Sequence, residues 1–212
     1  MSWVQEQADQ ILAAKPIADH SYFADLANGM SRDCFLDGQR QFYHAVSFFS
    51  RAMGALLARQ PDSASRQVLM HNLAEEHGLE EEHGLAHDRT FSQFLASLQS
   101  EPGPQGPEVR AFNLALYGAC AGESVPFAFA ALGIIEYAFA DISALIGTTV
   151  VQRGWVAQDQ LVHYSLHAEI DKRHAAEFFE VIEAAPGDEV QAGLVYGWHI
   201  FSQLYRSLWE RS

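Results

Sequence analysis

Cysteine is scarce in this sequence, which contains two, Cys34 and Cys120, among 212 residues. Two cysteines cannot form a framework of disulfides, and they are too few for a cysteine-rich zinc site. A chain with few thiols and no disulfide framework is typical of a reducing compartment. We therefore expect a cytoplasmic protein.

Basic side chains are also few, because 13 Lys and Arg stand against 27 Asp and Glu and give a formal net charge of −14. Binding to the phosphate backbone of nucleic acid requires clustered Lys and Arg, and so does binding to an anionic membrane surface. The charge argues against both partners. We expect a small-molecule substrate instead, with no nucleic acid and no membrane, and the composition leaves a homodimer open.

A third absence is the period-two alternation of β-strands, which no segment shows convincingly. Hydrophobic residues make up 49% and aromatics 12% of the chain, enough for a packed core in one all-α domain over residues 1–212. Three prolines and two glycines make 99–108 the clearest loop. Helical spacing predicts helices at about 2–14, 20–28, 32–59, 61–98, 109–121, 124–150, 156–184 and 188–210.

The long apolar run at residues 125–151 could span a bilayer by its length. Glu136 and Asp141 interrupt the run, however, and charged residues are costly inside a membrane. The first 16 residues have early acids and no long apolar run, unlike a signal peptide. We interpret the run as a helix buried in a soluble core, which makes Glu136 a buried carboxylate.

The stretch HAEIDKRH places His167, Asp171 and His174 at steps of four and three residues. These steps put the three side chains on one face of a helix among apolar neighbours, with His163 one turn earlier on the same face. The face is therefore expected to point inward. Polar groups buried in this way need partners.

A second polar face contains Glu76, Glu80, His83 and His87, which share one side of a helix if the two intervening glycines do not break it. Carboxylates and imidazoles that project from facing helices form the di-iron and di-manganese sites of helical bundles. Iron(II) accepts nitrogen and oxygen ligands, whereas a set of six exceeds the tetrahedral demand of zinc. The two faces together with Glu136 would supply such a set.

Ordinary structural roles account for each of these residues taken singly. A histidine on an inner face is more often a hydrogen-bonded core residue than a ligand. Glu136 could belong to a buried hydrogen-bond network or act as a general base. Glu81 and Glu82 are typical of a solvated helix face. Spacing alone therefore leaves a metal site and a buried polar network both open.

Four segments, NLAEEHG, HDRTFSQFLASL, GIIEYAF and HAEIDKRH, occur in this order and resemble the haem-oxygenase-like di-iron oxidases and oxygenases. The resemblance extends from about His20 to Arg206, and its most specific part is the H-x3-D-x2-H element. This group includes the chlamydial protein associating with death domains, and its fold is shared with thiaminase II and pyrroloquinoline-quinone synthase. The resemblance implies a bundle of about seven to eight helices.

The resemblance also implies a metal site, labile iron at two positions per chain and O2 as co-substrate. The implied chemistry is oxidation of a small amino-acid-like or fatty-acid substrate by N-oxygenation, desaturation or oxidative C–C cleavage. His83 is the alternative to His87 as the histidine ligand of the first helix. The residues implied as iron ligands are Glu76, His87, Glu136, His167, Asp171 and His174, and all but His87 are also implied to be catalytic.

The sequence departs from other branches of the fold. The position of the thiaminase II nucleophile is Ala130, and Cys120 cannot be assumed to replace it. The branch that forms para-aminobenzoate consumes its own Tyr and Lys, and the positions that match are Phe23 and Ile146. A haem oxygenase would need a proximal histidine, for which His20 is available, but inner carboxylates would occupy the space of the macrocycle.

Two alternatives remain beside the iron enzyme. One is a metal-free member of the fold that binds or transforms a small heterocycle, although the few basic residues suit an anionic substrate such as that of pyrroloquinoline-quinone synthase poorly. The other is a non-catalytic interaction module with a buried polar network. Several aromatic or imidazole side chains are expected either to line a substrate pocket or to pack in the core: Phe42, Tyr43, His44, Phe48 and Tyr137.

Overall fold

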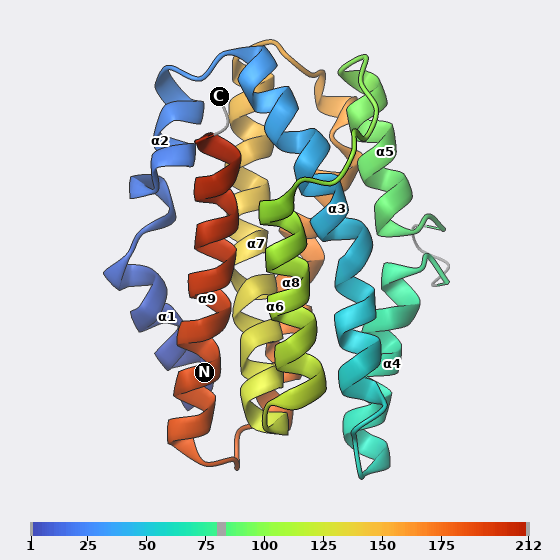
Figure 1. Cartoon of the computed structure of the whole chain (residues 1–212), viewed down its shortest axis with the longest axis vertical. Helices are drawn as coiled ribbons and strands as arrows, with labels where there is room; N and C mark the ends of the chain where they lie inside the picture. The colour runs from blue at the N-terminus through green and yellow to red at the C-terminus, as the bar shows by residue number, and fades with distance from the viewer. Residues whose placement is uncertain (1, 80–83, 211–212) are drawn as a thin grey trace.

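A computed structural model describes residues 2–79 and 84–210, and every regular element in these ranges is helical (Figure 1). The predicted all-α class is confirmed. The α-helices are α1 (Trp3–Ala14), α2 (Ser21–Asn28), α3 (Arg32–Leu57), α4 (Ser63–Glu76), α5 (His87–Ser97), α6 (Pro107–Gly122), α7 (Val125–Gln152), α8 (Val162–Val181) and α9 (Gly187–Trp209). Two 3-10 turns, η1 (Ile17–Asp19) and η2 (Gln158–Gln160), complete the described elements.

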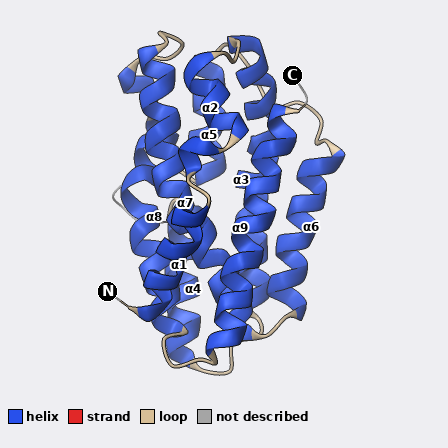
Figure 2. Cartoon of the chain, turned by 90° about the vertical axis from the view of Figure 1, so that its left-hand side faces the viewer, coloured by secondary structure: helices blue, strands red, loops and turns tan. Residues whose placement is uncertain are grey.

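The long helices run side by side along the long axis of the bundle, and α7 occupies its middle (Figures 1 and 2). Helix α7 packs most extensively on α8 and α9, while α3 packs on α6. A helix that is apolar all round is stable only when it is covered on all sides. By length and composition α7 could cross a membrane, but 78% of its most apolar window is buried inside the protein. The described structure thus places this run in the core.

Backbone-to-backbone contact joins α9 to α7. A Cβ atom at Gly193 would lie 2.3 Å from the carbonyl oxygen of Phe127, and one at Gly197 would lie 2.5 Å from that of Ala131. Ala130 is fully buried at this contact, and its own Cβ would lie 2.8 Å from a Cβ at Gly193. The glycines therefore let two long helices approach closely, and they hold α7 in register against its neighbour.

Polar residues at the helix starts explain where several elements begin. The side chain of Ser31 accepts a hydrogen bond from the backbone N–H of Cys34 at 3.1 Å and caps α3. Asp62 caps α4 through the N–H of Ser65 at 2.8 Å. Each cap satisfies one of the N–H groups that the first helical turn leaves without an intrahelical acceptor.

The predicted single helix over 61–98 is wrong, because α4 ends at Glu76 and α5 begins at His87. Gly78 has a φ of +66°, which favours glycine, and it donates to the carbonyl of Glu75 at 2.9 Å. The N–H of Leu79 donates to the carbonyl of Ala74 at 2.8 Å, completing a Schellman stop. The two helices lie end to end (Figure 1), so Glu76 and His87 both sit at helix ends beside the break.

Candidate metal centre

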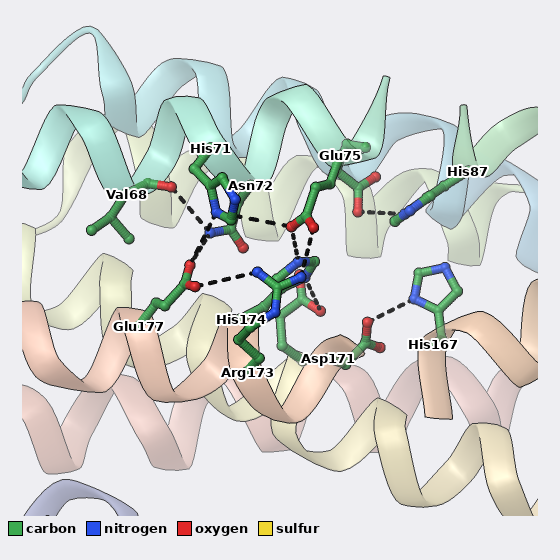
Figure 3. Close-up of polar contacts among 12 residues, drawn as sticks. Val68, His71, Asn72, Glu75, His87, His167, Asp171, Arg173, His174 and Glu177 are labelled. Carbon is green, nitrogen blue, oxygen red and sulfur yellow. Dashed lines mark hydrogen bonds and ion pairs between the residues drawn. The ribbon is translucent and has the colours of Figure 1, made fainter. Parts of the chain in front are cut away.

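Six side chains gather where the ends of α4 and α5 face α7 and α8, and Figure 3 labels four of them, His87, His167, Asp171 and His174. All six are buried, and each is at most 7% exposed. They are Glu76 from α4, His87 from α5, Glu136 from α7, and His167, Asp171 and His174 from α8. The structure thus brings together the whole predicted set with His87 as the histidine of the first helix. His83 and Glu80 lie outside the described residues.

Two imidazole–carboxylate pairs form one side of this cluster. Nδ1 of His87 lies 2.8 Å from Oε1 of Glu76, and Nδ1 of His167 lies 2.8 Å from Oδ1 of Asp171. The two imidazole rings meet edge to face with their centroids 4.5 Å apart. His87 contacts Glu76 from the start of α5 to the end of α4. The spacing had predicted that both would lie along one continuous helical face.

Glu136, Asp171 and His174 converge on a single point. One ligand atom from each lies within 4.8 Å of the others, and all three residues are buried. Nδ1 of His174 is 3.8 Å from Oε2 of Glu136. The periodicity of α8 places Asp171 and His174 on one side of the helix. Most buried residues of α7 are apolar, so the polar partners of the Glu136 carboxylate come from this side of α8.

Burial shifts the protonation of these groups. It raises the pKa of Glu136 to about 7 and the pKa of Asp171 to about 8, because an ionised carboxylate loses its hydration in the core. Burial lowers the pKa of His167 to about 3, since the imidazolium would likewise be desolvated. Without a bound cation, the cluster therefore resists full ionisation of its carboxylates.

Ion pairing outweighs burial at the other positions. Burial opposes the charged forms of Glu76 and His87, but their contact lowers the pKa of Glu76 and raises that of His87. Burial also acts to lower the pKa of His174, whereas contacts with Glu136 and Glu75 raise it to about 10. Positive charge is thus stabilised next to this group of carboxylates.

Several ligand atoms in the cluster have no hydrogen-bond partner within residues 2–79 and 84–210. They are Oε1 of Glu136, Oδ2 of Asp171, Nε2 of His167 and Nδ1 of His174. Leaving such atoms buried and unpaired costs about 1–3 kcal/mol each. A coordinated cation would remove that cost, and a mixed set of imidazole nitrogen and carboxylate oxygen suits iron(II). The residues present therefore fit a metal centre.

Two further residues, Glu75 and His163, join the cluster. The sequence did not predict either of them as a ligand. Oε2 of Glu75 lies 2.5 Å from Nε2 of His174. Nδ1 of the fully buried His163 pairs with the hydroxyl of Thr90 at 2.9 Å, while its Nε2 has no partner in the described part of the chain. The spacing placed His163 on the correct face, but nothing in the local sequence distinguished Glu75 from other acids near helix ends.

A small cavity of about 40 Å³ adjoins the cluster. Its polar walls are Glu76, Glu136 and His167, and aromatic and aliphatic side chains form the rest. These apolar walls are Phe42, Ala45, Val46, Phe49, Phe112, Ile135, Phe139 and Phe201. The cavity therefore presents hydrocarbon surface to anything that approaches the cluster.

Of the five side chains considered for a pocket wall, Phe42 lines this cavity. The other four have contacts elsewhere. Nε2 of His44 lies 2.7 Å from the carbonyl of Gly103, and Tyr43 packs beside Phe91. Phe48 packs against Tyr117, and the hydroxyl of Tyr137 donates to Asp9 at 2.8 Å. Helical spacing identified these rings as inward or partly buried, but it could not tell which of the inward directions faces the cavity.

Comparison with known proteins places the chain in a family. A model of the family described as iron-containing redox enzymes matches residues 39–206, which is most of the chain. A 4-aminobenzoate synthase of Chlamydia trachomatis is 23% identical over 207 residues, covering 94% of this chain and 88% of that protein. The matched region includes every described candidate ligand.

Solved structures share the fold at low sequence identity. A CADD-like protein of unknown function from Nostoc punctiforme superposes with a TM-score of 0.80 at 17% identity, covering 99% of this chain and 96% of that one. A TenA homologue from Pseudomonas syringae gives 0.77 at 16% identity, with 98% and 91% covered. A domain with a haem-oxygenase-like fold from Shewanella denitrificans gives 0.76 at 14% identity, with 99% and 90% covered. With its helical bundle of this fold and its buried carboxylate–imidazole cluster, the chain belongs to the family of iron-containing redox enzymes.

Proposed function

We propose that this protein is an oxygen-dependent oxidase or oxygenase that holds two iron ions in the buried cluster. One observation carries the proposal: three buried carboxylates and three buried imidazoles converge in a chain of an iron-containing redox family, and four of their ligand atoms have no partner among the described residues. A buried network of ordinary hydrogen bonds would be expected to satisfy those atoms. Their convergence supports coordination instead.

The cluster would divide its ligands into two sets, one for each ion. Glu136, Asp171 and His174 would hold one ion, and Glu76, His87 and His167 would hold the other, with carboxylates able to bridge. Bound iron would supply the activation of O2 that side chains alone cannot provide. The protein supplies the ligands, their orientation and a site from which bulk water is excluded.

The lining of the cavity supports a proposal about which part of a substrate would meet the cluster. Phe42, Phe139 and Phe201 stand among its apolar walls, and none of the residues that line it is Lys or Arg. An apolar or aromatic part of a small organic substrate would therefore lie beside Glu136 and His167, with any charged group held away from the cluster. N-oxygenation, desaturation and oxidative C–C cleavage are the reactions that we propose for such a substrate.

The name of the chlamydial relative suggests 4-aminobenzoate synthesis as an alternative reaction. The family resemblance assigns that reaction to a Tyr and a Lys that are consumed, and the matching positions here are the buried Phe23 and Ile146. The two lysines of the chain do not replace the missing one: Lys15 follows the last residue of α1, and Nζ of the half-exposed Lys172 pairs with Asp141 at 2.7 Å. These positions favour an external substrate.

A metal-free, TenA-like reaction with a cysteine nucleophile has less support. Ala130 occupies the expected nucleophile position and packs against α9. Neither Cys34 nor Cys120 lines the cavity beside the cluster, and burial raises the pKa of the Cys120 thiol to about 12. A thiol with so high a pKa is a poor nucleophile at neutral pH.

An anaerobic titration of the metal-free protein with Fe(II), followed by rapid mixing with O2, tests the proposal. We expect about two irons per chain and a transient visible absorbance that His167→Ala abolishes. His199→Ala is the matched control, because His199 is exposed on α9 and should leave both results unchanged. If the wild-type protein retains no iron and does not react with O2 while circular dichroism shows an intact fold, the proposal is wrong.

A further inference from the structure

We infer that Glu75 is a positioning residue of the centre: its carboxylate holds the outer nitrogen of His174, so that the inner nitrogen faces the cluster. The inference rests on the proposed function, because it assumes that the cluster binds iron. Glu75 itself would not be a ligand. It would act through His174 alone.

The contacts of the His174 ring support this role. Nε2 lies 2.5 Å from Oε2 of Glu75, whereas Nδ1 faces Oε2 of Glu136 at 3.8 Å and has no hydrogen-bond partner in the described chain. The imidazole is 1% exposed, so water cannot replace either contact freely. A carboxylate that accepts the outer N–H of a metal-binding imidazole sets the direction of the ring and makes the inner nitrogen a better ligand.

The pair formed by Glu75 and His174 differs from the other two imidazole–carboxylate pairs. His87 with Glu76, and His167 with Asp171, each join two candidate ligands. An ion that binds either pair competes with the hydrogen bond inside it. Glu75 lies outside the converging carboxylates and outside the cavity walls, so its bond to His174 can persist when the cluster is filled.

A network between α4 and α8 holds the Glu75 carboxylate in place (Figure 3). Arg173 donates to Oε1 of Glu75 at 2.6 Å and to Oε1 of Glu177 at 3.3 Å. Oε2 of Glu177 in turn accepts from Asn72 at 2.9 Å. The side chain of Glu75 is 16% exposed, and Arg173 holds its Oε1 in this partly buried network. Its Oε2 is nearest to Nε2 of His174, with Nδ1 of His71 farther away at 3.9 Å.

Three variants separate positioning from packing. Glu75→Leu removes the acceptor, and Glu75→Gln keeps an acceptor oxygen but removes the charge. Glu177→Gln is the matched control, because Glu177 belongs to the same network and contacts Arg173 but makes no hydrogen bond or ion pair with His174 among the described residues. Circular dichroism and thermal melting would show that each variant folds.

Two measurements on each variant test the inference, namely the Fe(II) affinity under anaerobic conditions and the 1H NMR spectrum of the Fe(II)-loaded protein. In Glu75→Leu we expect an affinity for Fe(II) about 10–100-fold weaker. We also expect faster exchange with solvent of the His174 N–H proton, whose resonance the bound iron shifts. Glu75→Gln should restore slow exchange and recover part of the affinity. Glu177→Gln should stay within about twofold of the wild type, since a contact this distant contributes little.

The outcomes distinguish the inference from the proposed function. A wild-type protein that binds no Fe(II) overturns the proposed function and the inference with it. A wild-type protein that binds Fe(II), together with a folded Glu75→Leu variant of equal affinity and unchanged exchange, overturns the inference alone. Equal losses in Glu75→Leu and Glu177→Gln would also overturn it, because they would assign the effect to the network as a whole.

Discussion

The two halves of the candidate centre are built in different ways. Glu136 and the H-x3-D-x2-H residues project from the interiors of α7 and α8, two continuous helices in extensive contact. Glu76 and His87 instead stand at the last and first residues of helices that flank a break. Side chains in helix interiors have their directions set by the whole helix, whereas helix ends can shift by changing a few dihedral angles. The comparison indicates a preformed half on α7–α8 and an adjustable half on α4–α5.

The largest expected effect concerns how the halves share iron. Asp171→Asn should lower Fe(II) affinity by about 100-fold or more, since even the loss of a partner behind a ligand costs about 10–100-fold. Asp171 lies with Glu136 and His174 at one proposed ion and contacts His167, a proposed ligand of the other ion. Glu76→Gln should leave one ion bound at Glu136, Asp171 and His174. Iron content after anaerobic gel filtration measures the difference. Equal loss of both ions from the two variants would contradict the division of the ligands into two sets.

The packing under the preformed half gives the next largest effect. Gly193→Ala should lower the free energy of unfolding by about 3 kcal/mol, because its Cβ would lie 2.3 Å from the backbone of α7. Gly118→Ala in α6 is the control, since no atom lies within 4 Å of its Cβ position. The control should stabilise the protein by about 0.5–1 kcal/mol. Urea titrations compare the two, and a neutral Gly193→Ala would show that α7 and α9 can separate without cost.

A smaller effect on stability is expected at Gly78, just after the end of α4 in the adjustable half. Gly78→Ala should cost about 2 kcal/mol, because φ is +66° and the new Cβ would lie 2.5 Å from the backbone N of Ala86. Gly84→Ala shares the positive φ, at +56°, but its Cβ would meet no atom of the described residues within 4 Å, so about 1 kcal/mol is expected. In Gly78→Ala the ion at Glu76 and His87 should be lost before the other. Iron content measured alongside urea unfolding tests this order.

The smallest expected effect is on stability and concerns His20, which is not part of the candidate centre. It tests whether a group outside the centre contributes to the loss of stability at low pH. Nδ1 of His20 caps α2 by accepting from Tyr22, and Nε2 contacts the carbonyl of Ser202 at 3.0 Å. Burial lowers the pKa of His20, so the stability that it contributes is present above the usual histidine pKa and is lost as the pH falls. The urea midpoint should drop slightly more between pH 7.5 and pH 5 in wild type than in His20→Asn. An identical drop would remove His20 from the pH response.

Much of the helical framework could be predicted from residue spacing. The run predicted at 124–150 is α7, Val125–Gln152, because a long segment without strong breakers has few alternatives to a helix. The helix predicted at 156–184 is shorter, at Val162–Val181, since η2 precedes it and Leu161 begins it without a side-chain cap. Helix ends depend on local bonds that periodicity does not register.

The break between Glu76 and His87 was the main error of the sequence interpretation. Each intervening glycine carried a penalty of about 1 kcal/mol, which a continuous helix could have absorbed. The end-to-end arrangement of α4 and α5 places Glu76 and His87 beside the break, and the Schellman bonds of Gly78 and Leu79 end α4 there. Both are properties of the folded chain, so the spacing between Glu76 and His87 could not reveal them.

The sequence by itself determined the all-α class, the burial of α7 and the face on which His167, Asp171 and His174 lie, because these follow from local periodicity and hydrophobicity. Only the tertiary structure decided that Glu76 meets His87 across a break, that Glu75 reaches His174, and that Phe42 rather than Tyr43 lines the cavity. Those contacts depend on how helices distant in the chain rotate and approach one another. Local sequence patterns carry little information about that geometry.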